Sequence, residues 1–505
     1  MEDLESLWNR LVAHERQTSL LTSIVSILSW DERTGLPPRG AEWRAEQLAY
    51  LAGQVHQRRT STELGDLLER LRESELAADP HSDRGATIAR LKHDYDKERK
   101  LPQRLVEELS RAEVLGQQAW VEARAARDFA RFRPSLETNL RLRREQADAT
   151  GYESNRYDAL LDSYEPGETT ENVRRALSDL RAALLPLLAR VRDSGVPQDD
   201  SILHGDFPVD AQRRIGRRAA EAIGFDFERG RLDETDHPFC TEAGPHDHRI
   251  LTRYDAGGFA QAFYGTLHEA GHGIYEQGLR SAFYGLPPGA FVSLGLHESQ
   301  SRLWENLVGR SRSFWEFLYG EVRQAFPAAL GAIGLDSFWR AVNVVRPSLI
   351  RVEADELTYN LHIIARFELE EALVRGDLPV DELPAAWNAK YAEYLGIVPP
   401  HDGVGVLQDV HWSAALFGYF PTYALGNLYA GHWFEAAQRD LGDLDAMFRV
   451  GDFVPLRRWL NEHLHRHGRC YLPPELLQRV CGQSLSSRPL IAYLNAKLDR
   501  LLDRS

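Results

Sequence analysis

The sequence predicts a mainly α-helical protein that folds as one large body over residues 1–505. Apolar residues three and four positions apart recur along the chain and predict helices, the clearest of them at 41–57, 105–126 and 170–192. Strand signals are sparse, and the best of them covers residues 249–254. Stretches rich in proline and glycine are short, so no linker is expected to divide the chain.

Composition excludes several classes of protein. The 505 residues contain 60 Lys and Arg against 75 Asp and Glu, and an acidic chain without a basic block is a poor binder of nucleic acid. Three cysteines in no CxxC pair indicate a reducing compartment, so we expect a cytoplasmic protein. The apolar run 19–30 is shorter than the roughly 20 residues that span a bilayer. We expect a buried helix there and no membrane partner.

An HExxH motif lies in a predicted helix over about 257–277, with Asp255 as a candidate N-terminal cap. Because residues four apart share one face of a helix, His268 and His272 can bind the same metal ion. Glu269 is then placed to take a proton from the attacking water. The motif therefore predicts a metal-dependent hydrolase.

Two glycines interrupt this helix, at Gly271 and Gly273. Each costs about 1 kcal/mol relative to alanine in a helix interior. Close approach of another element to the helix would explain why they are there.

A catalytic zinc site has three protein ligands and one open position, so a third ligand is needed. A second amphipathic helix is predicted over about 296–306, and it carries Glu298 and Glu305 on one face. Either glutamate could bind the ion while the other orients a ligand side chain through a hydrogen bond. His297 is a rival ligand, which spacing alone does not exclude.

An ordered series of motifs extends over nearly the whole chain, at 30–41, 237–239, 247–249, 268–272, 297–299, 350–355, 405–412 and 417–426. This series resembles the metallocarboxypeptidases of the carboxypeptidase Taq type. One departure is visible, because Leu251 stands where that family has threonine in its Asp-x-Arg-x-Thr motif, and Thr252 follows one place later.

The resemblance implies a helical ellipsoid with a deep central groove, similar to the thimet-oligopeptidase-like zinc peptidases. Residues from about 1 to 200 would form part of the groove wall, and residues from about 230 to 435 would carry the motifs. The resemblance also implies a homodimer. It implies Glu298 as the third metal ligand, because Glu298 is the glutamate of the His-Glu-Ser motif.

A polar stripe is predicted on a long helix that begins near Pro347, comprising Arg351, Asp355, Thr358, His362 and Arg366. The family motif indicates that Arg351 pairs with the C-terminal carboxylate of a peptide. The alternative is a structural arginine paired with Asp355, and we expect Asp355, like Glu305, to support the site from behind. His237 is expected to help bind the same end of the substrate, or else to be a packing histidine.

Residues 407–433 are dense in aromatic side chains, most of which are expected in the core. Related helical zinc peptidases place a histidine and a tyrosine from such a segment beside the oxyanion. Tyr423 is the preferred candidate for that role and His411 the second. Tyr419 is the competing tyrosine and a candidate substrate contact.

The sequence therefore predicts a carboxypeptidase of broad specificity that releases single amino acids from peptides with a free C-terminus. We expect one divalent ion per chain, with zinc as the default and cobalt or manganese as alternatives that accept the same donors. Glu269 would be the general base. The alternatives are an endo-oligopeptidase on the same scaffold and a catalytically inactive peptide-binding protein.

Overall fold

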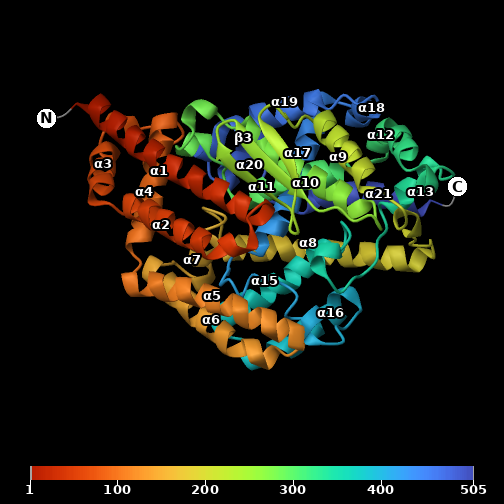
Figure 1. Cartoon of the computed structure of the whole chain (residues 1–505), viewed down its shortest axis with the longest axis horizontal. Coiled ribbons are helices and arrows are strands. Elements are labelled where there is room, and N and C mark those ends of the chain that lie inside the picture. The colour runs from red at the N-terminus through yellow and green to blue at the C-terminus, as the bar shows by residue number, and fades with distance from the viewer. Residues whose placement is uncertain (1–2, 504–505) are drawn as a thin grey trace.

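The computed structural model describes residues 3–503 and is mainly helical, as predicted (Figure 1). The first part of the chain forms the helices α1 (Leu4–Thr34), α2 (Ala41–Arg59), α3 (Thr62–Arg72), α4 (Asp83–Arg99), α5 (Gln103–Ala126), α6 (Phe129–Thr150), α7 (Arg156–Leu161), α8 (Thr170–Ser194) and α9 (Val209–Ile223).

After a small sheet, helices again account for most of the chain. They are α10 (Ala260–Gly278), α11 (Leu294–Arg302), α12 (Arg312–Ala325), α13 (Pro327–Leu330), α14 (Leu335–Ala341), α15 (Tyr359–Arg375), α16 (Leu383–Leu395), α17 (Pro421–Leu441), α18 (Leu444–Arg449), α19 (Val454–His463), α20 (Pro473–Cys481) and α21 (Arg488–Leu502). None of the described helices is long and apolar enough to cross a membrane.

The sheet has three strands in the order β1-β3-β2: β1 (Gly230–Glu234), β2 (Phe239–Gly244) and β3 (Asp247–Thr252). β1 is parallel to β3 and β2 is antiparallel to it, with Thr241 opposite Arg249. The predicted strand at 249–254 overlaps β3, which begins and ends two residues earlier. The sheet packs against α10 and so borders the helix that carries the HExxH motif.

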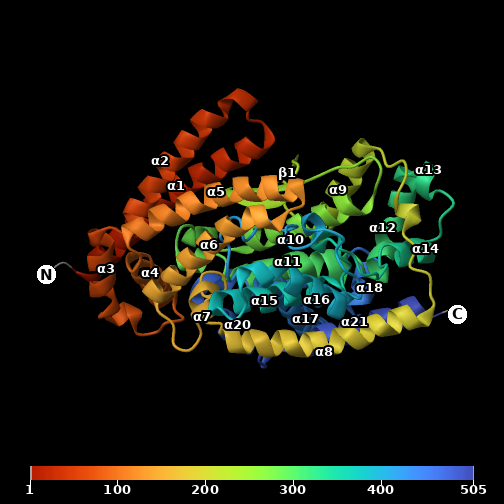
Figure 2. The same ribbon diagram turned by 90° about the horizontal axis from the view of Figure 1, so that it is seen from below.

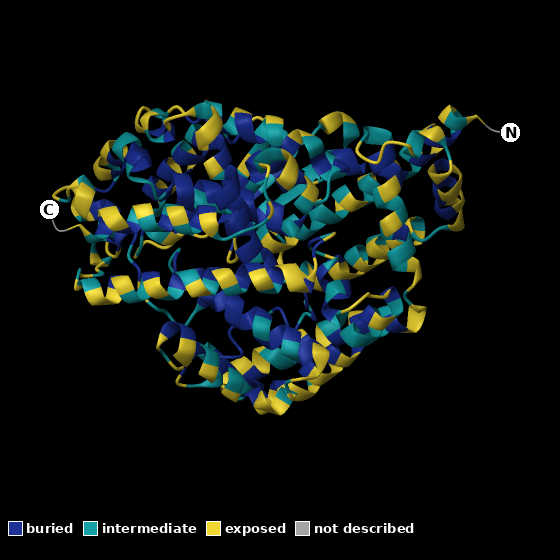
Figure 3. Cartoon of the chain, turned by 180° about the vertical axis from the view of Figure 1, so that it is seen from behind, coloured by how far each residue is buried: buried dark blue, intermediate teal, exposed yellow. Residues whose placement is uncertain are grey.

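The helices surround a core formed chiefly by the second half of the chain. Figure 3 shows the buried residues concentrated in the middle of the molecule, where α10, α11, α15 and α17 lie. A separate, smaller apolar cluster joins α1, α3 and α4 at the N-terminal end. Figure 2 shows α1 and α2 as a hairpin that projects from the body, and α8 as a long helix along the opposite side.

The predicted helices at 41–57, 105–126 and 170–192 are confirmed as α2, α5 and α8, with ends within two residues. The buried helix predicted at 19–30 is helical, as part of α1, but its burial was predicted wrongly. Its apolar side chains Leu20, Ile24 and Ile27 are 62%, 44% and 37% exposed. The reason is that α1 belongs to the projecting hairpin, which the main body covers on one side only.

The long helix predicted from Pro347 is also wrong, because α15 begins only at Tyr359. Arg351 lies instead in a single 3₁₀ turn, Arg351–Glu353. Asp355 explains the late start. Its carboxylate accepts hydrogen bonds from the backbone N–H groups of Leu357 and Thr358, and this local turn competes with helix.

The close approach expected at the helix glycines is confirmed where α11 crosses α10. A Cβ atom on Gly271 would lie 2.7 Å from the carbonyl oxygen of Gln300 and 2.7 Å from the Cα atom of Ser301. On the other side of α11, a Cβ atom on Gly426 of α17 would lie 2.6 Å from the Cγ atom of Glu298. Glycine at both positions lets three helices approach at backbone distance.

We predict that Gly271→Ala destabilises the protein, because its methyl group would meet backbone atoms of α11 that cannot move alone. Overpacking of this kind costs about 1–3 kcal/mol. Gly320→Ala on α12 is the matched control, because a Cβ there meets nothing within 4 Å and alanine gains about 1 kcal/mol of helix propensity. Denaturant titration of both variants measures the difference, and equal stability would contradict the tight crossing.

Candidate metal centre

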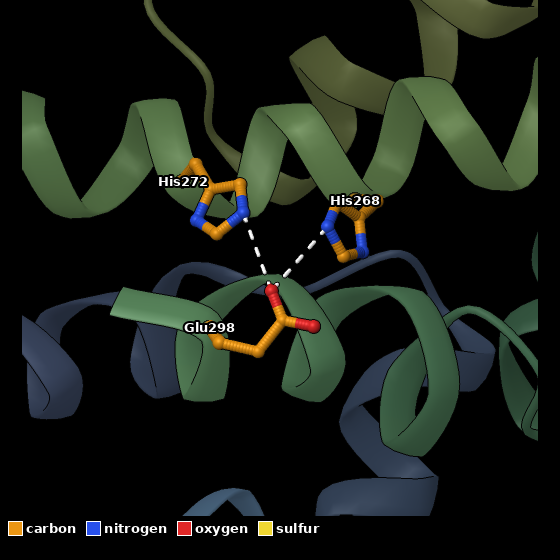
Figure 4. Close-up of side chains that lie close together, drawn as sticks. All are labelled: His268, His272 and Glu298. Carbon is orange, nitrogen blue, oxygen red and sulfur yellow. Dashed lines mark ion pairs between the residues drawn. The ribbon is translucent and has the colours of Figure 1, made fainter. Parts of the chain in front are cut away.

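The two histidines of the HExxH motif project from one face of α10 toward α11 (Figure 4). The Nδ1 atom of His268 lies 2.9 Å from the Oε2 atom of Glu305, and the Nδ1 atom of His272 lies 3.0 Å from the carbonyl oxygen of His297. Since a carbonyl oxygen only accepts, Nδ1 of His272 carries the proton and its Nε2 atom keeps a free lone pair. The Glu305 carboxylate favours the same tautomer for His268.

Glu298 faces both Nε2 atoms from α11. Its Oε2 atom lies 3.5 Å from Nε2 of His268 and 3.5 Å from Nε2 of His272 (Figure 4). The ligand atoms of the three residues all lie within 4.8 Å of one another. Tetrahedral coordination with bonds of about 2.0–2.2 Å separates its ligands by about 3.3–3.6 Å. The two histidine–glutamate distances therefore match a divalent cation with nitrogen and oxygen donors.

Arg302 and Ser301 hold the Glu298 carboxylate in place. Arg302 donates from Nε to Oε1 at 2.7 Å, and Ser301 donates from Oγ to Oε2 at 3.0 Å. Burial alone would raise the pKa of Glu298, but the Arg302 charge and the two imidazoles hold it well below its usual range. Glu298 is thus ionised and presents one oxygen to the histidines.

Glu305 lies on the wider helical turn that follows α11, Leu303–Val308, and it supports His268. Arg302 and Arg310 lie 3.3 Å and 3.5 Å from its two oxygens. These charges outweigh the effect of burial and lower the pKa of Glu305 to about 2. The spacing of the two glutamates left their roles open, and the structure places Glu298 at the Nε2 atoms and Glu305 behind His268.

His297, the rival ligand, points elsewhere. Its Nε2 atom lies 2.8 Å from the Oε1 atom of Glu276, and its ring stacks on that of His272 with centroids 4.4 Å apart. It takes no part in the group of ligand atoms formed by the described residues.

Glu269 lies next to His268 and is 6% exposed. Burial raises its pKa to about 7. No described residue donates a hydrogen bond to its carboxylate, so both oxygens are available to a water molecule or to substrate.

His411 and Tyr423 contact each other: the His411 Nε2 atom lies 3.1 Å from the Tyr423 hydroxyl. Burial lowers the pKa of His411 to about 3, so its ring is neutral. The ring of Tyr419 lies 5.4 Å from that of Tyr423 and 5.3 Å from that of His411, centroid to centroid. The structure thus brings all three aromatic candidates together.

Arg351 joins this group, with its guanidinium carbon 4.9 Å from the centre of the Tyr423 ring. Its partner is Asp409 and not Asp355: Nε and Nη2 donate to Oδ1 of Asp409 at 3.0 and 2.8 Å, and Nη1 donates to the Tyr359 hydroxyl at 3.0 Å. Arg351 is 6% exposed. Of the five guanidinium N–H groups, two have no acceptor among the described residues.

Asp355 and His237 lie apart from these contacts. Asp355 is used by the turn that precedes α15, where it also accepts from the Thr358 hydroxyl at 2.6 Å and the Arg346 backbone at 3.1 Å. His237 is exposed in the turn between β1 and β2 and makes no described contact with the histidine–glutamate group. At the altered motif Leu251 is fully buried, and the Thr252 hydroxyl donates to the carbonyl oxygen of Ala262 at 3.3 Å.

Two charged residues that organise the site, Arg302 and Asp409, were not predicted from the sequence. Arg302 lies in the predicted helix at 296–306, and Asp409 lies in the motif at 405–412. Arg302 follows Glu298 by four residues, which is an i,i+4 ion-pair signal on a helix. Nothing local marks Asp409, whose second oxygen accepts from Nε of Arg366 at 2.7 Å.

Comparison with known proteins agrees with the motif series. The model of the carboxypeptidase Taq (M32) metallopeptidase family matches residues 10–498. The thermostable carboxypeptidase 1 of Thermus thermophilus is 46% identical over 98% of each chain, and the carboxypeptidase 1 of Bacillus subtilis is 39% identical over 96% of this chain and 97% of the relative.

Solved structures give the same result. The M32 carboxypeptidase of Deinococcus radiodurans superimposes with a TM-score of 0.95 at 42% identity, covering 98% of this chain and 99% of the other. The metallocarboxypeptidase 1 of Trypanosoma cruzi superimposes with a TM-score of 0.92 at 32% identity, covering 99% of both chains. The chain therefore belongs to the carboxypeptidase Taq (M32) family of metallopeptidases and is a metallocarboxypeptidase.

Proposed function

We propose that the chain removes single amino acids from peptide C-termini, with His268, His272 and Glu298 holding one divalent cation. The observation that carries this proposal is the meeting of three ligand atoms within 4.8 Å, each on a side chain oriented by a further hydrogen bond. Two imidazoles and a carboxylate favour zinc, and they also suit cobalt or manganese.

A cation bound there would polarise the scissile carbonyl and lower the pKa of the attacking water. Glu269 takes the proton from that water and returns it to the leaving amine. Its position beside His268, and the absence of other described hydrogen bonds to its carboxylate, support this role.

Tyr423 donates a hydrogen bond from its hydroxyl to the oxyanion that develops on the substrate carbonyl, and His411 orients that hydroxyl. A donor of this kind is worth roughly 3 kcal/mol in the transition state. Tyr419 contacts the substrate from beside Tyr423.

Arg351 pairs with the terminal carboxylate of the substrate through the two N–H groups that Asp409 and Tyr359 leave open. Asp409 fixes the other side of the guanidinium. His237 is proposed as a further contact with that end of the peptide, for which the structure offers no supporting contact. We also propose that the chain forms a single domain with a central groove, that it is a homodimer and that it is cytoplasmic.

Mass spectrometry of a peptide ladder, with and without a chelator, tests the activity. Stepwise loss of single C-terminal residues that stops on chelation supports the proposal. Cleavage of amidated peptides at internal bonds would instead indicate the endo-oligopeptidase alternative, and no cleavage with metal bound would indicate an inactive scaffold.

We predict that the two glutamates differ in their effect on metal binding. Glu298→Ala removes the ligand atom that faces both Nε2 atoms, so the protein should lose its ion on dialysis. Glu305→Ala removes only the group behind His268, so the ion should stay bound with an affinity reduced by about 10–100-fold. Metal analysis and chelator competition measure both. A normal metal content in Glu298→Ala, with loss in Glu305→Ala, would reverse the assignment.

For the general base, Glu269→Gln keeps the shape of the side chain but removes its ability to accept a proton at neutral pH. We expect the variant to bind metal and peptide normally and to lose several orders of magnitude in kcat. Equilibrium binding of a peptide alongside the kinetics separates the two effects. Near-normal turnover with metal bound would exclude this role.

For the anchor, Arg351→Ala should impair cleavage of peptides with a free C-terminus, because a charge-assisted hydrogen bond is worth about 1.5–3 kcal/mol. Cleavage by Arg351→Lys should be impaired less, since lysine keeps the positive charge but lacks the paired N–H donors of the planar guanidinium. The residual rate on the matched amidated peptides should hardly change. Kinetics on acid and amide pairs measure this selectivity.

A melting curve provides the control for Arg351, because removing it leaves the Asp409 carboxylate with one cation fewer. Some loss of stability is therefore expected in Arg351→Ala. Equal losses of activity on the acid and the amide, together with a lowered Tm, would mean that Arg351 is structural and that another group selects the free C-terminus.

A further inference from the structure

Glu370 is a buried carboxylate on α15 that the proposed reaction does not use. Its Oε1 atom accepts from the Tyr157 hydroxyl at 2.6 Å and from the backbone N–H of Gly418 at 2.8 Å. Its Oε2 atom accepts from the indole Nε1–H of Trp412 at 2.6 Å. Burial raises the pKa of Glu370 to about 7, against the effect of these donors. One side chain thus satisfies donors from three separate places in the chain.

Two of these donors belong to the segment that carries the candidate oxyanion residues. We call residues 408–420 the aromatic loop; it leads directly into α17, where Tyr423 lies in the first turn. Trp412 directly follows His411, and Gly418 directly precedes Tyr419. Glu370 therefore ties together the two points at which the loop leaves and rejoins the site.

The backbone between these two points is in an uncommon conformation. Ala415 has a φ of 52°, in the left-handed region that side chains other than glycine rarely adopt. Gly418 has a φ of 87°, and a Cβ atom there would lie 2.7 Å from the carbonyl carbon of Leu160. Such conformations persist only where the surroundings determine them.

Two side chains of α6 hold carbonyl groups of the loop. Asn139 donates from Nδ2 to the carbonyl oxygen of Trp412 at 2.8 Å, and Arg143 donates from Nε to that of Ala415 at 2.7 Å. Both come from α6. Within the loop, the backbone N–H of Leu416 donates to the carbonyl oxygen of His411 at 2.9 Å. Glu370 adds the side-chain bridge between Trp412 and Gly418, with one oxygen for each.

We propose that Glu370 is a positioning residue that closes the base of the aromatic loop and so places His411 and Tyr419, and with them Tyr423, beside the substrate. This inference rests on the proposed function, because it assigns Glu370 an effect on catalysis through the oxyanion donors. Glu370 does not touch the metal ligands, which come from α10 and α11. Its loss should therefore change turnover without releasing the ion.

Glutamine cannot replace Glu370 here. The indole N–H of Trp412 and the backbone N–H of Gly418 are donors only, and each needs its own acceptor oxygen. An amide offers one oxygen, and its NH₂ group would face the other donor. Glu370→Gln must therefore release one end of the loop.

The experiment compares Glu370→Gln with Glu371→Gln. Glu371 is the next residue on α15 and is also buried, but its partners are Arg174, Asn155 and Arg375, none of which belongs to the loop. We expect Glu370→Gln to lose about 10–100-fold in kcat, as expected for a displacement of about 1 Å, with KM changed less than about threefold and a normal metal content. Glu371→Gln should keep kcat within about twofold of the wild type.

The double variant Glu370→Gln/Trp412→Phe tests the mechanism. Phenylalanine removes the donor that the amide cannot satisfy, so the glutamine oxygen can serve Gly418 and Tyr157. We expect this variant to regain at least about threefold in kcat over Glu370→Gln, a coupling that independent structural losses do not produce. Should Glu370→Gln not fold, Trp412→Phe alone should lower kcat by about 3–10-fold at normal KM.

Wild-type activity on a free C-terminal peptide is measured first. A wild type without carboxypeptidase activity would overturn the proposed function, and this inference with it. An active wild type with equal kcat in Glu370→Gln and Glu371→Gln, or a loss that tracks metal content or Tm, would overturn the role of Glu370 alone. Additive effects of the two substitutions on kcat in the double variant would also overturn the role of Glu370.

Discussion

The candidate site depends on the position of one short helix, α11, between α10 and α17. Gly271 on one side and Gly426 on the other let the three backbones approach so closely that α11 has little room to shift. At its N-terminus the Glu165 carboxylate accepts from the backbone N–H of Gly295. Because Glu298 is placed by these backbone contacts, the distance between its carboxylate and the two imidazoles is a property of the helix crossing.

Charge compensation follows from that crossing. Three carboxylates, those of Glu269, Glu298 and Glu305, lie close together in a buried place, where unpaired charges are costly. Arg302 bonds to both Glu298 and Glu305, while Glu269 has no described cationic partner. The carboxylates of Glu298, the proposed ligand, and of Glu305, which supports His268, are thus held ionised, whereas that of Glu269, the proposed general base, has no such partner. This separation of roles by environment is what general acid–base chemistry requires.

The sequence was most informative where the determining contacts are local. The spacing of His268 and His272 fixes their shared face within one helix turn, so this pair needed no tertiary information. The choice between Glu298 and Glu305 did need tertiary information, because both lie on the same face of the predicted helix. Only the motif resemblance favoured Glu298. Their actual difference is whether a carboxylate meets the Nε2 or the Nδ1 side of His268. The start of α15 was mispredicted because the Asp355 turn competes with the helix, and Asp409 was missed because its partner Arg351 lies 58 residues away.

Asp409 also shows why the proposed site suits an exopeptidase. A carboxypeptidase must hold the terminal carboxylate one residue beyond the bond it cleaves, so the carboxylate anchor and the oxyanion donor need a fixed separation. Asp409 binds Arg351 through one oxygen and Arg366 through the other, and it stands two residues before His411, the neighbour of Tyr423. The proposed anchor and the proposed oxyanion donor are therefore tied to the same short stretch of buried chain. An endopeptidase gains nothing from such a constraint, because its substrates continue past the cleaved bond in both directions.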